Sequence, residues 1–232
     1  MIYHRSLTRL IPVVLFLVLA PKVAAKAQAP AQEGPKHRRV AGIRDVTGSV
    51  SPDGRYYAFT NWQTGQLGVK DLSTGENRYI VTPGSEGESP YAARFAPDGR
   101  YIAYDLQLRD DSPDRDIFLL EIDGGREIPL VEGPGIERVL DWTPDGKRLL
   151  FDSDQGLLPG TGRRAWLIEV VHGEPIGEPV LVEPEIRVIR GLGFSHDGAY
   201  FYCCGGQDAY ASPTSLYLAT LDPATGELSV RR

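Results

Sequence analysis

Aspartate is the residue type whose recurrence in this sequence could most readily support chemistry. Asp53, Asp98, Asp145 and Asp197 each precede a glycine, at successive intervals of 45, 47 and 52 residues. Four carboxylates brought into one ring could bind a cation or exchange protons. Three of the four, however, lie in the tripeptide Pro-Asp-Gly, which is itself a turn signal. We therefore interpret the recurring aspartates as turn residues.

A second concentration of carboxylates lies at residues 109–116, Arg-Asp-Asp-Ser-Pro-Asp-Arg-Asp. Acids at this density could bind a hard cation such as Ca²⁺. The spacing does not match a calcium-binding Asp-x-Asp-x-Asp-Gly loop, and two arginines stand among the acids. These features favour a solvated loop over a metal site.

The sequence lacks the usual catalytic patterns. It contains no Gly-x-Ser-x-Gly elbow, P-loop, zincin motif or dinucleotide fingerprint. Beyond residue 27 its histidines are His37, His172 and His196, and their spacing matches neither a zinc site nor a catalytic triad. We expect no catalytic residue, no cofactor and no metal site, and thus a protein that is not an enzyme.

The elements that position the aspartates are a turn and a following strand, and the chain repeats this unit four times. The copies are residues 51–59 (Ser-Pro-Asp-Gly-Arg-Tyr-Tyr-Ala-Phe), 96–104, 143–151 and a degraded copy at 195–203. Proline presets φ, aspartate bonds the nearby backbone, and glycine takes a positive φ. The predicted turn residues are Pro52, Asp53, Gly54, Pro97, Asp98, Gly99, Pro144, Asp145, Gly146, Asp197 and Gly198.

After each glycine the apolar residues alternate, which is typical of a strand. The alternating pairs are Tyr57 and Phe59, Ile102 and Tyr104, Leu149 and Phe151, and Phe201 and Cys203. We expect these pairs to pack between successive units. A repeat of 45–52 residues indicates propeller blades, so the predicted fold is an all-β propeller of four-stranded antiparallel blades. In the first blade the expected strands are 47–51, 55–61, 66–72 and 77–82.

These turns, followed by Arg-Tyr-hydrophobic-Ala-aromatic strands, resemble the WD40-like PD40 repeats of TolB-type β-propellers. Related repeats occur in prolyl-oligopeptidase-like enzymes and in multidomain bacterial regulators. The resemblance covers residues 45–232, where we place blades at about 45–84, 90–133, 137–184 and 188–232. It specifies the repeat and leaves function open, because a propeller is a scaffold for many activities.

The number of blades departs from that family, whose propellers close with more blades than the four countable here. Open end blades would expose strand edges and apolar faces. Four blades could close into a ring, form an open arc, associate with another copy through the end blades, or belong to a shortened relative of a longer protein.

Residues 1–27 are predicted to be a signal peptide, and residues 28–44 a linker. Arg5 and Arg9 precede an apolar run of 11 residues from Leu10 to Ala20, whereas a membrane span needs roughly 18–20. Ala25 and Ala27 are small residues suited to cleavage. We expect a periplasmic or secreted bacterial protein with no stable membrane span after cleavage.

The charge and the cysteine content each argue against one property of the protein. The net charge of −6 argues against nucleic acid as a partner. Cys203 and Cys204 are neighbours, so no disulfide framework spans the fold.

The predicted function is an exported, non-enzymatic propeller, similar to TolB, that mediates protein–protein interaction in the cell envelope. The alternative is an accessory or remnant of a prolyl-oligopeptidase-like hydrolase or of a multidomain regulator. The 109–116 loop should share a face with the connections between blades, where propellers commonly meet ligands. Asp110, Asp111 and Asp114 are therefore candidate partner contacts.

Overall fold

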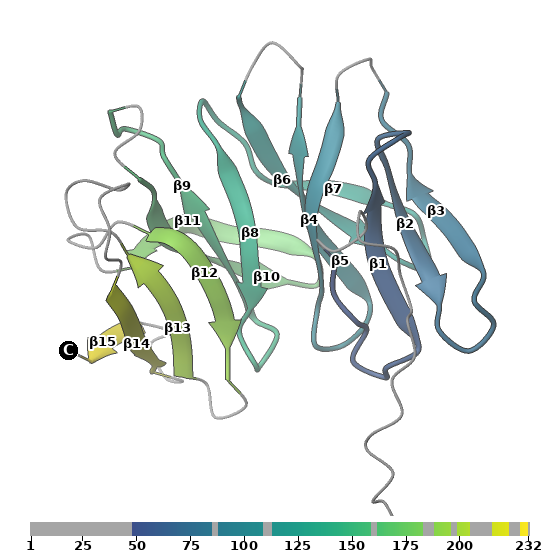
Figure 1. Ribbon diagram of the computed structural model, residues 1–232. Helices are drawn as coiled ribbons and strands as arrows, with labels where there is room; N and C mark the ends of the chain where they lie inside the picture. Colours follow the sequence, from purple (N-terminus) through teal and green to yellow (C-terminus); the bar gives the residue numbers. More distant parts are fainter. Residues whose placement is uncertain are drawn as a thin grey trace, which may run out of the picture. The chain divides into compact units, whose positions relative to one another are not determined.

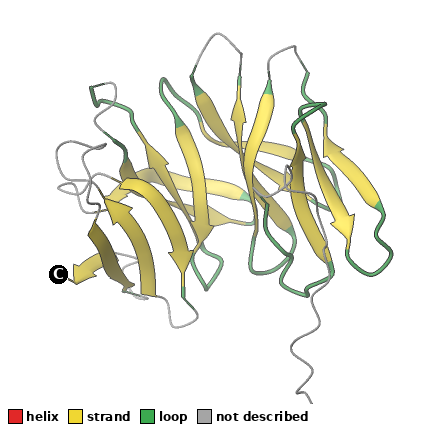
Figure 2. Cartoon of the chain, viewed as in Figure 1, coloured by secondary structure: helices red, strands yellow, loops and turns green. Residues whose placement is uncertain are grey.

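The structure is a computed structural model that describes residues 48–84, 88–108, 113–158, 162–182, 188–195, 199–204, 215–222 and 228–231. The chain divides into two units, Met1–Arg38 and Arg39–Arg232, and every described residue belongs to the second. The predicted signal peptide and linker lie outside the described residues. Each regular element in the described ranges is a β-strand, which confirms the all-β prediction (Figure 2).

Fifteen strands form four antiparallel sheets in which each strand pairs with the next in sequence (Figure 1). The first sheet has three strands and the other three have four each. The strands are β1 (Tyr56–Asn61), β2 (Gln66–Asp71), β3 (Asn77–Val81); β4 (Ser89–Phe95), β5 (Tyr101–Gln107), β6 (Arg115–Glu121), β7 (Glu127–Val131); β8 (Glu137–Trp142), β9 (Arg148–Ser153), β10 (Arg164–Val171), β11 (Glu174–Val182); β12 (Val188–Phe194), β13 (Ala199–Cys204), β14 (Ser215–Leu221) and β15 (Leu228–Arg231).

The first sheet differs from the four-stranded blade expected for it. Residues 48–50, within the predicted first strand, make one isolated bridge between Val50 and Tyr57, and the Ala58 N–H donates to the Ser49 carbonyl at 2.9 Å. In later sheets the equivalent strand lies beside its counterpart in the preceding sheet, as β8 lies beside β4. Residues 48–50 contact the second sheet through the Ser49 hydroxyl, which accepts the Phe95 N–H at 2.9 Å, and Val50 is 53% exposed. This segment pairs with β1 over fewer residues than β4 pairs with β5.

The three described Pro-Asp-Gly turns share one geometry. The glycines have φ near +70°, and each glycine N–H donates to the carbonyl three residues earlier at 2.8–2.9 Å. The aspartate Oδ1 accepts the backbone N–H two residues later, at 3.0 Å for Asp53, 2.9 Å for Asp98 and 3.1 Å for Asp145. These carboxylates therefore act locally within their turns. Asp197 and Gly198 lie outside the described residues.

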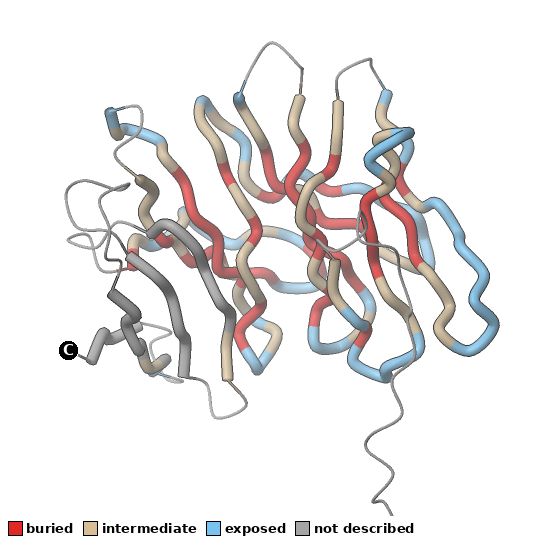
Figure 3. Tube along the Cα trace, viewed as in Figure 1, coloured by how far each residue is buried: buried red, intermediate tan, exposed pale blue. Residues whose placement is uncertain are grey.

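Two buried clusters fill the spaces between sheets. One combines Ala58 of the first sheet with Ile102 and Tyr104 of the second. The other combines Tyr101 of the second sheet with Leu149 and Phe151 of the third. Strand β5 thus buries side chains on both faces, and Figure 3 shows buried segments along the middle strands. The predicted pairs Ile102/Tyr104 and Leu149/Phe151 do lie between sheets.

The pair Tyr57 and Phe59 occupies a different environment. Ala58 joins the cluster that faces the second sheet, so its neighbours in the strand point to the opposite, outer face. There Phe59 packs against the ring of Tyr79, with centroids 6.1 Å apart, and a Cβ at Gly68 would lie 2.7 Å from Phe59 Cζ. Gly68 provides the space in which Phe59 packs, and Phe59 is only 7% exposed.

Candidate functional site

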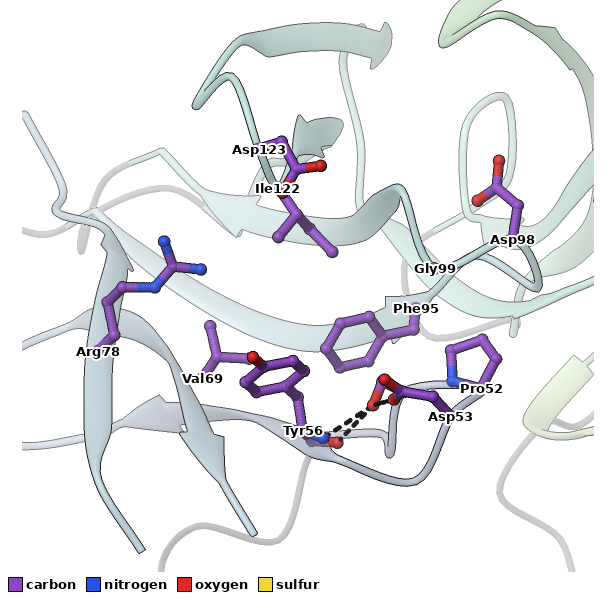
Figure 4. A pocket seen from close by; sticks show the side chains of 11 residues that line it. Pro52, Asp53, Tyr56, Val69, Arg78, Phe95, Asp98, Gly99, Ile122 and Asp123 are labelled. Carbon is purple, nitrogen blue, oxygen red and sulfur yellow. Dashed lines mark hydrogen bonds between the residues drawn. The ribbon is translucent and has the colours of Figure 1, made fainter. Parts of the chain in front are cut away.

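A cleft of about 310 Å³ opens between the first and second sheets, at the end that carries the Pro-Asp-Gly turns (Figure 4). We call it the turn cleft. Residues from both sheets line it: Ser51, Pro52, Asp53, Tyr56, Val69, Arg78, Phe95, Asp98, Gly99, Ile122 and Asp123.

The turn cleft lies where the Pro-Asp-Gly turns of the first two sheets come close to each other. A Cβ at Gly99 would lie 3.9 Å from Pro52 Cδ, an ordinary van der Waals contact. Val69 and Phe95 are buried at 4% and 8% exposure and supply apolar surface. Tyr56, at the start of β1, is partly exposed. The cleft thus combines an apolar interior with the polar turn residues of two sheets.

Four charged side chains line the turn cleft, three carboxylates and one guanidinium. Hydrogen bonds from the Ser51 hydroxyl at 2.6 Å and from the Arg55 N–H hold the pKa of Asp53 below its ordinary value, so this carboxylate is ionised at neutral pH. Arg78 and Asp123 make no side-chain hydrogen bond or ion pair with another described residue. Figure 4 shows Asp98 and Asp53 toward one end and Arg78 toward the other.

The equivalent cleft between the second and third sheets is smaller, with a volume of about 90 Å³. Tyr101, which occupies the repeat position of Tyr56, is 6% exposed and lies against Gly173, where a Cβ would be 2.7 Å from the Tyr101 ring. Arg126 and Glu174 form an ion pair between these two sheets. The tyrosine at this repeat position is therefore buried in the second cleft, as Tyr101, and partly exposed in the turn cleft, as Tyr56.

Buried ion pairs lie in the second and third sheets, at the ends of β5 and β9 that are away from the Pro-Asp-Gly turns. Asp105 and Asp152 each stand seven residues after a turn aspartate and are 1% and 0% exposed. Arg138 donates to both Asp152 oxygens, at 2.9 and 2.6 Å. Arg115 lies 3.5 Å from Asp105, whose Oδ1 also accepts the Val139 N–H at 3.3 Å. Every carboxylate here has a structural partner.

Burial has the largest effect on the pKa values of Asp105 and Asp152. It raises the pKa of Asp105 to about 6, against the opposing charge of Arg115, and it raises the pKa of Asp152 against Arg138. Removing water from a carboxylate disfavours its ionised form, and the arginines offset part of that cost.

Glu137, at the start of β8, is a second buried carboxyl and is 2% exposed. Its Oε1 accepts the Ser153 hydroxyl at 2.8 Å, whereas Oε2 has no hydrogen-bond partner. Burial raises the pKa of Glu137 to about 7, and the charges of Asp116 and Asp154 act in the same direction. Sequence reasoning singled out neither this group nor the Asp105–Asp152 network.

The predicted partner-contact residues are only partly described. Asp114 is partly exposed at the base of its loop, where its carbonyl accepts the Leu108 N–H at 3.3 Å. Asp110 and Asp111 lie outside the described residues. His172 is exposed in a hairpin turn with φ of 53°. In the described ranges no group of histidine, cysteine, aspartate or glutamate side chains is placed to hold a metal, and no helix could span a membrane.

No family model matches the sequence. Over 133 residues the chain is 28% identical to Protein NirF of Pseudomonas aeruginosa, a match that covers 53% of this chain and 31% of NirF. Over 125 residues it is 28% identical to the TolB homolog of Chlorobium chlorochromatii, covering 52% of this chain and 27% of that protein. The chain therefore spans less than a third of the length of these two relatives in the matches.

The arrangement of strands agrees with solved TolB structures. TolB from Acinetobacter baumannii superposes with a TM-score of 0.60 at 21% identity, over 82% of this chain and 44% of that one. The chain has a TolB-like β-propeller fold. Oligogalacturonate lyase in complex with manganese, at 16% identity, also superposes with a TM-score of 0.60, over 82% of this chain and 54% of the lyase. The TolB-like fold therefore includes enzymes, and fold alone does not decide function.

Proposed function

We propose that this TolB-like propeller is an exported, non-enzymatic module that binds a protein partner in the cell envelope. The observation that carries the proposal is the turn cleft, an open, partly apolar hollow with exposed charges at its rim. Protein partners commonly bury an anchoring side chain in such a pocket. The relatives named NirF and TolB homolog support the comparison with TolB.

The buried carboxyls support a structural role more than a catalytic one. Asp105 and Asp152 are enclosed by arginines and backbone donors, and neither lines the turn cleft. A general acid or base must reach the proton that it transfers. The alternative is an accessory or remnant of a prolyl-oligopeptidase-like hydrolase or of a multidomain bacterial regulator, and enzymes are among the proteins that share this fold. Intrinsic hydrolytic or lyase activity of the purified chain would contradict the proposal.

The experiment that tests it is site-specific photo-crosslinking in the intact cell envelope. A photo-reactive amino acid replaces Arg78, an exposed residue at the rim of the turn cleft. A matched variant carries it in place of Val180, which is 59% exposed on β11 and is not among the lining residues of the cleft. We expect one discrete protein adduct from position 78 and none from position 180. Equal labelling from both positions, or none from position 78, would overturn the proposal.

The end blades supply a second candidate partner surface, for another copy of the chain. Val50 is 53% exposed and Tyr79, on the outer face of the first sheet, is 44% exposed. Phe59 packs over Gly68 and against Tyr79 on that face. Its apolar surface is therefore already buried, which reduces the apolar area that association would bury. Sedimentation across a dilution series tests this: a dimer that survives dilution supports association, and a monomer at nanomolar concentration excludes it.

A further inference from the structure

We propose that the turn cleft binds a lysine or arginine side chain of the partner protein. The inference rests on the proposed function, since it takes the partner to be a protein, and it adds the chemical class of the anchoring residue. It is drawn from the size of the cleft, its walls and the distribution of its charges.

The volume and walls of the turn cleft fit a long side chain with an aliphatic stem. About 310 Å³ is at the lower limit of pockets that hold small molecules, and it is ample for a single side chain. Val69, Phe95 and Ile122 offer an apolar surface for methylene groups. The aromatic rings of Tyr56 and Phe95 line the same hollow (Figure 4). A ring face attracts a cation, and the Arg55 guanidinium already lies 5.0 Å from the centroid of the Tyr56 ring.

The charges favour a cation over an anion. Three carboxylates line the cleft against one guanidinium. Asp53 and Asp98 each use Oδ1 in their own turn, and in the described part of the chain their Oδ2 atoms take no recorded hydrogen bond. The turns that carry them lie close together, since a Cβ at Gly99 would be 3.9 Å from Pro52 Cδ. These two Oδ2 atoms are thus available to accept hydrogen bonds from an ammonium or guanidinium group.

Arg78 contributes to orientation. It lies toward the end of the cleft opposite Asp98 (Figure 4), where its charge repels a cation. A basic side chain would therefore enter with its charged group toward Asp53 and Asp98 and its stem toward Val69. Repulsion at the wrong end gives specificity in addition to the attraction at the right end.

The second cleft provides an internal comparison. It also contains Asp98, but Tyr101 lies against Gly173 and the remaining volume is about 90 Å³. The space beside Tyr101 is less than a third of the volume of the turn cleft and offers a lysine side chain correspondingly less room. The proposal therefore assigns the binding to one of two repeat-related positions.

The test uses three fluorescein-labelled pentapeptide libraries with a fixed central residue and mixed flanking residues. The central residue is lysine, its neutral analogue norleucine, or glutamate. Fluorescence anisotropy should show binding of the lysine library, weakened about tenfold by norleucine and abolished by glutamate. Raising the salt concentration should weaken the lysine library, because screening reduces the attraction between charges.

Asp53→Asn keeps the turn acceptor while removing the charge, and it should weaken the lysine library several-fold. Asp145→Asn is the matched control. Asp145 accepts from the Thr143 hydroxyl at 2.6 Å and from the Lys147 N–H, as Asp53 does from Ser51 and Arg55, but it does not line either cleft. Equal effects of the two variants, equal binding of the norleucine library, or no binding of the lysine library would overturn the inference.

This experiment separates the inference from the proposed function. A crosslinked envelope partner at position 78 together with no preference for lysine would refute the inference alone. A lysine-dependent signal that Asp53→Asn weakens, together with no envelope adduct, would refute the proposed function alone.

Discussion

Replacing Glu137 by glutamine should change how the stability of the protein depends on pH. Glu137 is 2% exposed and its Oε2 has no hydrogen-bond partner. Its pKa rises from an ordinary 4.5 to about 7 on folding. The folded state therefore holds a proton that the unfolded state releases at lower pH. This stabilises the protein fully below about pH 4.5, and the contribution is lost as pH rises to 7 and above.

The size of the effect follows from the difference in proton affinity. Each tenfold change in affinity corresponds to about 1.4 kcal/mol, so the change in pKa from 4.5 to about 7 sets an upper limit of about 3.5 kcal/mol. Part of this contribution is already lost below pH 5, where the unfolded state begins to ionise, so we expect about 2 kcal/mol to be lost between pH 5 and pH 8. Glu137→Gln keeps the acceptor for Ser153 and cannot ionise. It should be as stable as the wild type at pH 5 and more stable by about 2 kcal/mol at pH 8.

The assay is urea unfolding at several pH values between 5 and 8, followed by tryptophan fluorescence, to which the buried Trp142 contributes. The difference between wild type and variant isolates Glu137 from Asp105 and other groups that titrate in this range. Glu76→Gln, at an exposed glutamate, serves as the control and should follow the wild type. Parallel stability curves for wild type and Glu137→Gln would show that Glu137 is ionised in the folded protein at neutral pH, and would refute the reasoning.

Three further substitutions test the packing by equilibrium unfolding. Asp152→Ala should destabilise the protein by about 3 kcal/mol, because it leaves Arg138 without its bidentate partner. Its control is Glu121→Ala, which removes a more exposed ion pair with Arg100 and should cost less than about 1 kcal/mol. Equal losses of stability would contradict the importance of the buried pair. Gly99 has φ +73°, so Gly99→Ala should lower the free energy of unfolding by about 1 kcal/mol. Gly133→Ala, at a position without a left-handed φ, should leave it nearly unchanged. An unchanged stability of Gly99→Ala would argue against the turn geometry. Phe59→Ala should cost about 2–3 kcal/mol and Tyr79→Ala clearly less, and the reverse order would place Phe59 outside the packed region.

The repeat made the all-β class and the position of the turns predictable. Each Pro-Asp-Gly turn is specified by residues within four positions of one another, so local sequence suffices. The alternation after each turn indicated one packed face. It did not indicate the second, because a strand between two sheets is buried on both sides, as Tyr101 to Leu106 of β5 are.

The turn cleft depends on contacts that the repeat does not encode. Tyr56 and Tyr101 occupy the same repeat position, yet Tyr101 is closed over by Gly173, and Tyr56 remains partly exposed. Gly173 belongs to a hairpin 72 residues further along the chain. Whether such a pair meets is decided by how two sheets pack, which the alternation within one strand cannot reveal.

The buried Asp105 and Asp152 left a signal that could have been found. Both stand seven residues after the turn aspartate, where the first repeat has Thr60. A polar residue recurring at one position of an otherwise apolar strand predicts a paired buried group. The partner arginines, Arg138 and Arg115, come from different strands at no fixed spacing, so the pairing required the structure.

The meander of strands has a consequence for synthesis and folding. Each sheet is completed by consecutive residues, and the contacts of β4 with β1 and of β8 with β4 join sheets that are neighbours in sequence. In such an array stability is approximately a sum over units and their interfaces. As the chain leaves the ribosome, each new sheet can dock on one already formed. The second sheet packs against the first on one face and against the third on the other. Its amide hydrogens should therefore exchange more slowly than those of the first sheet, where the strand residues Asn77 to Tyr79 are exposed.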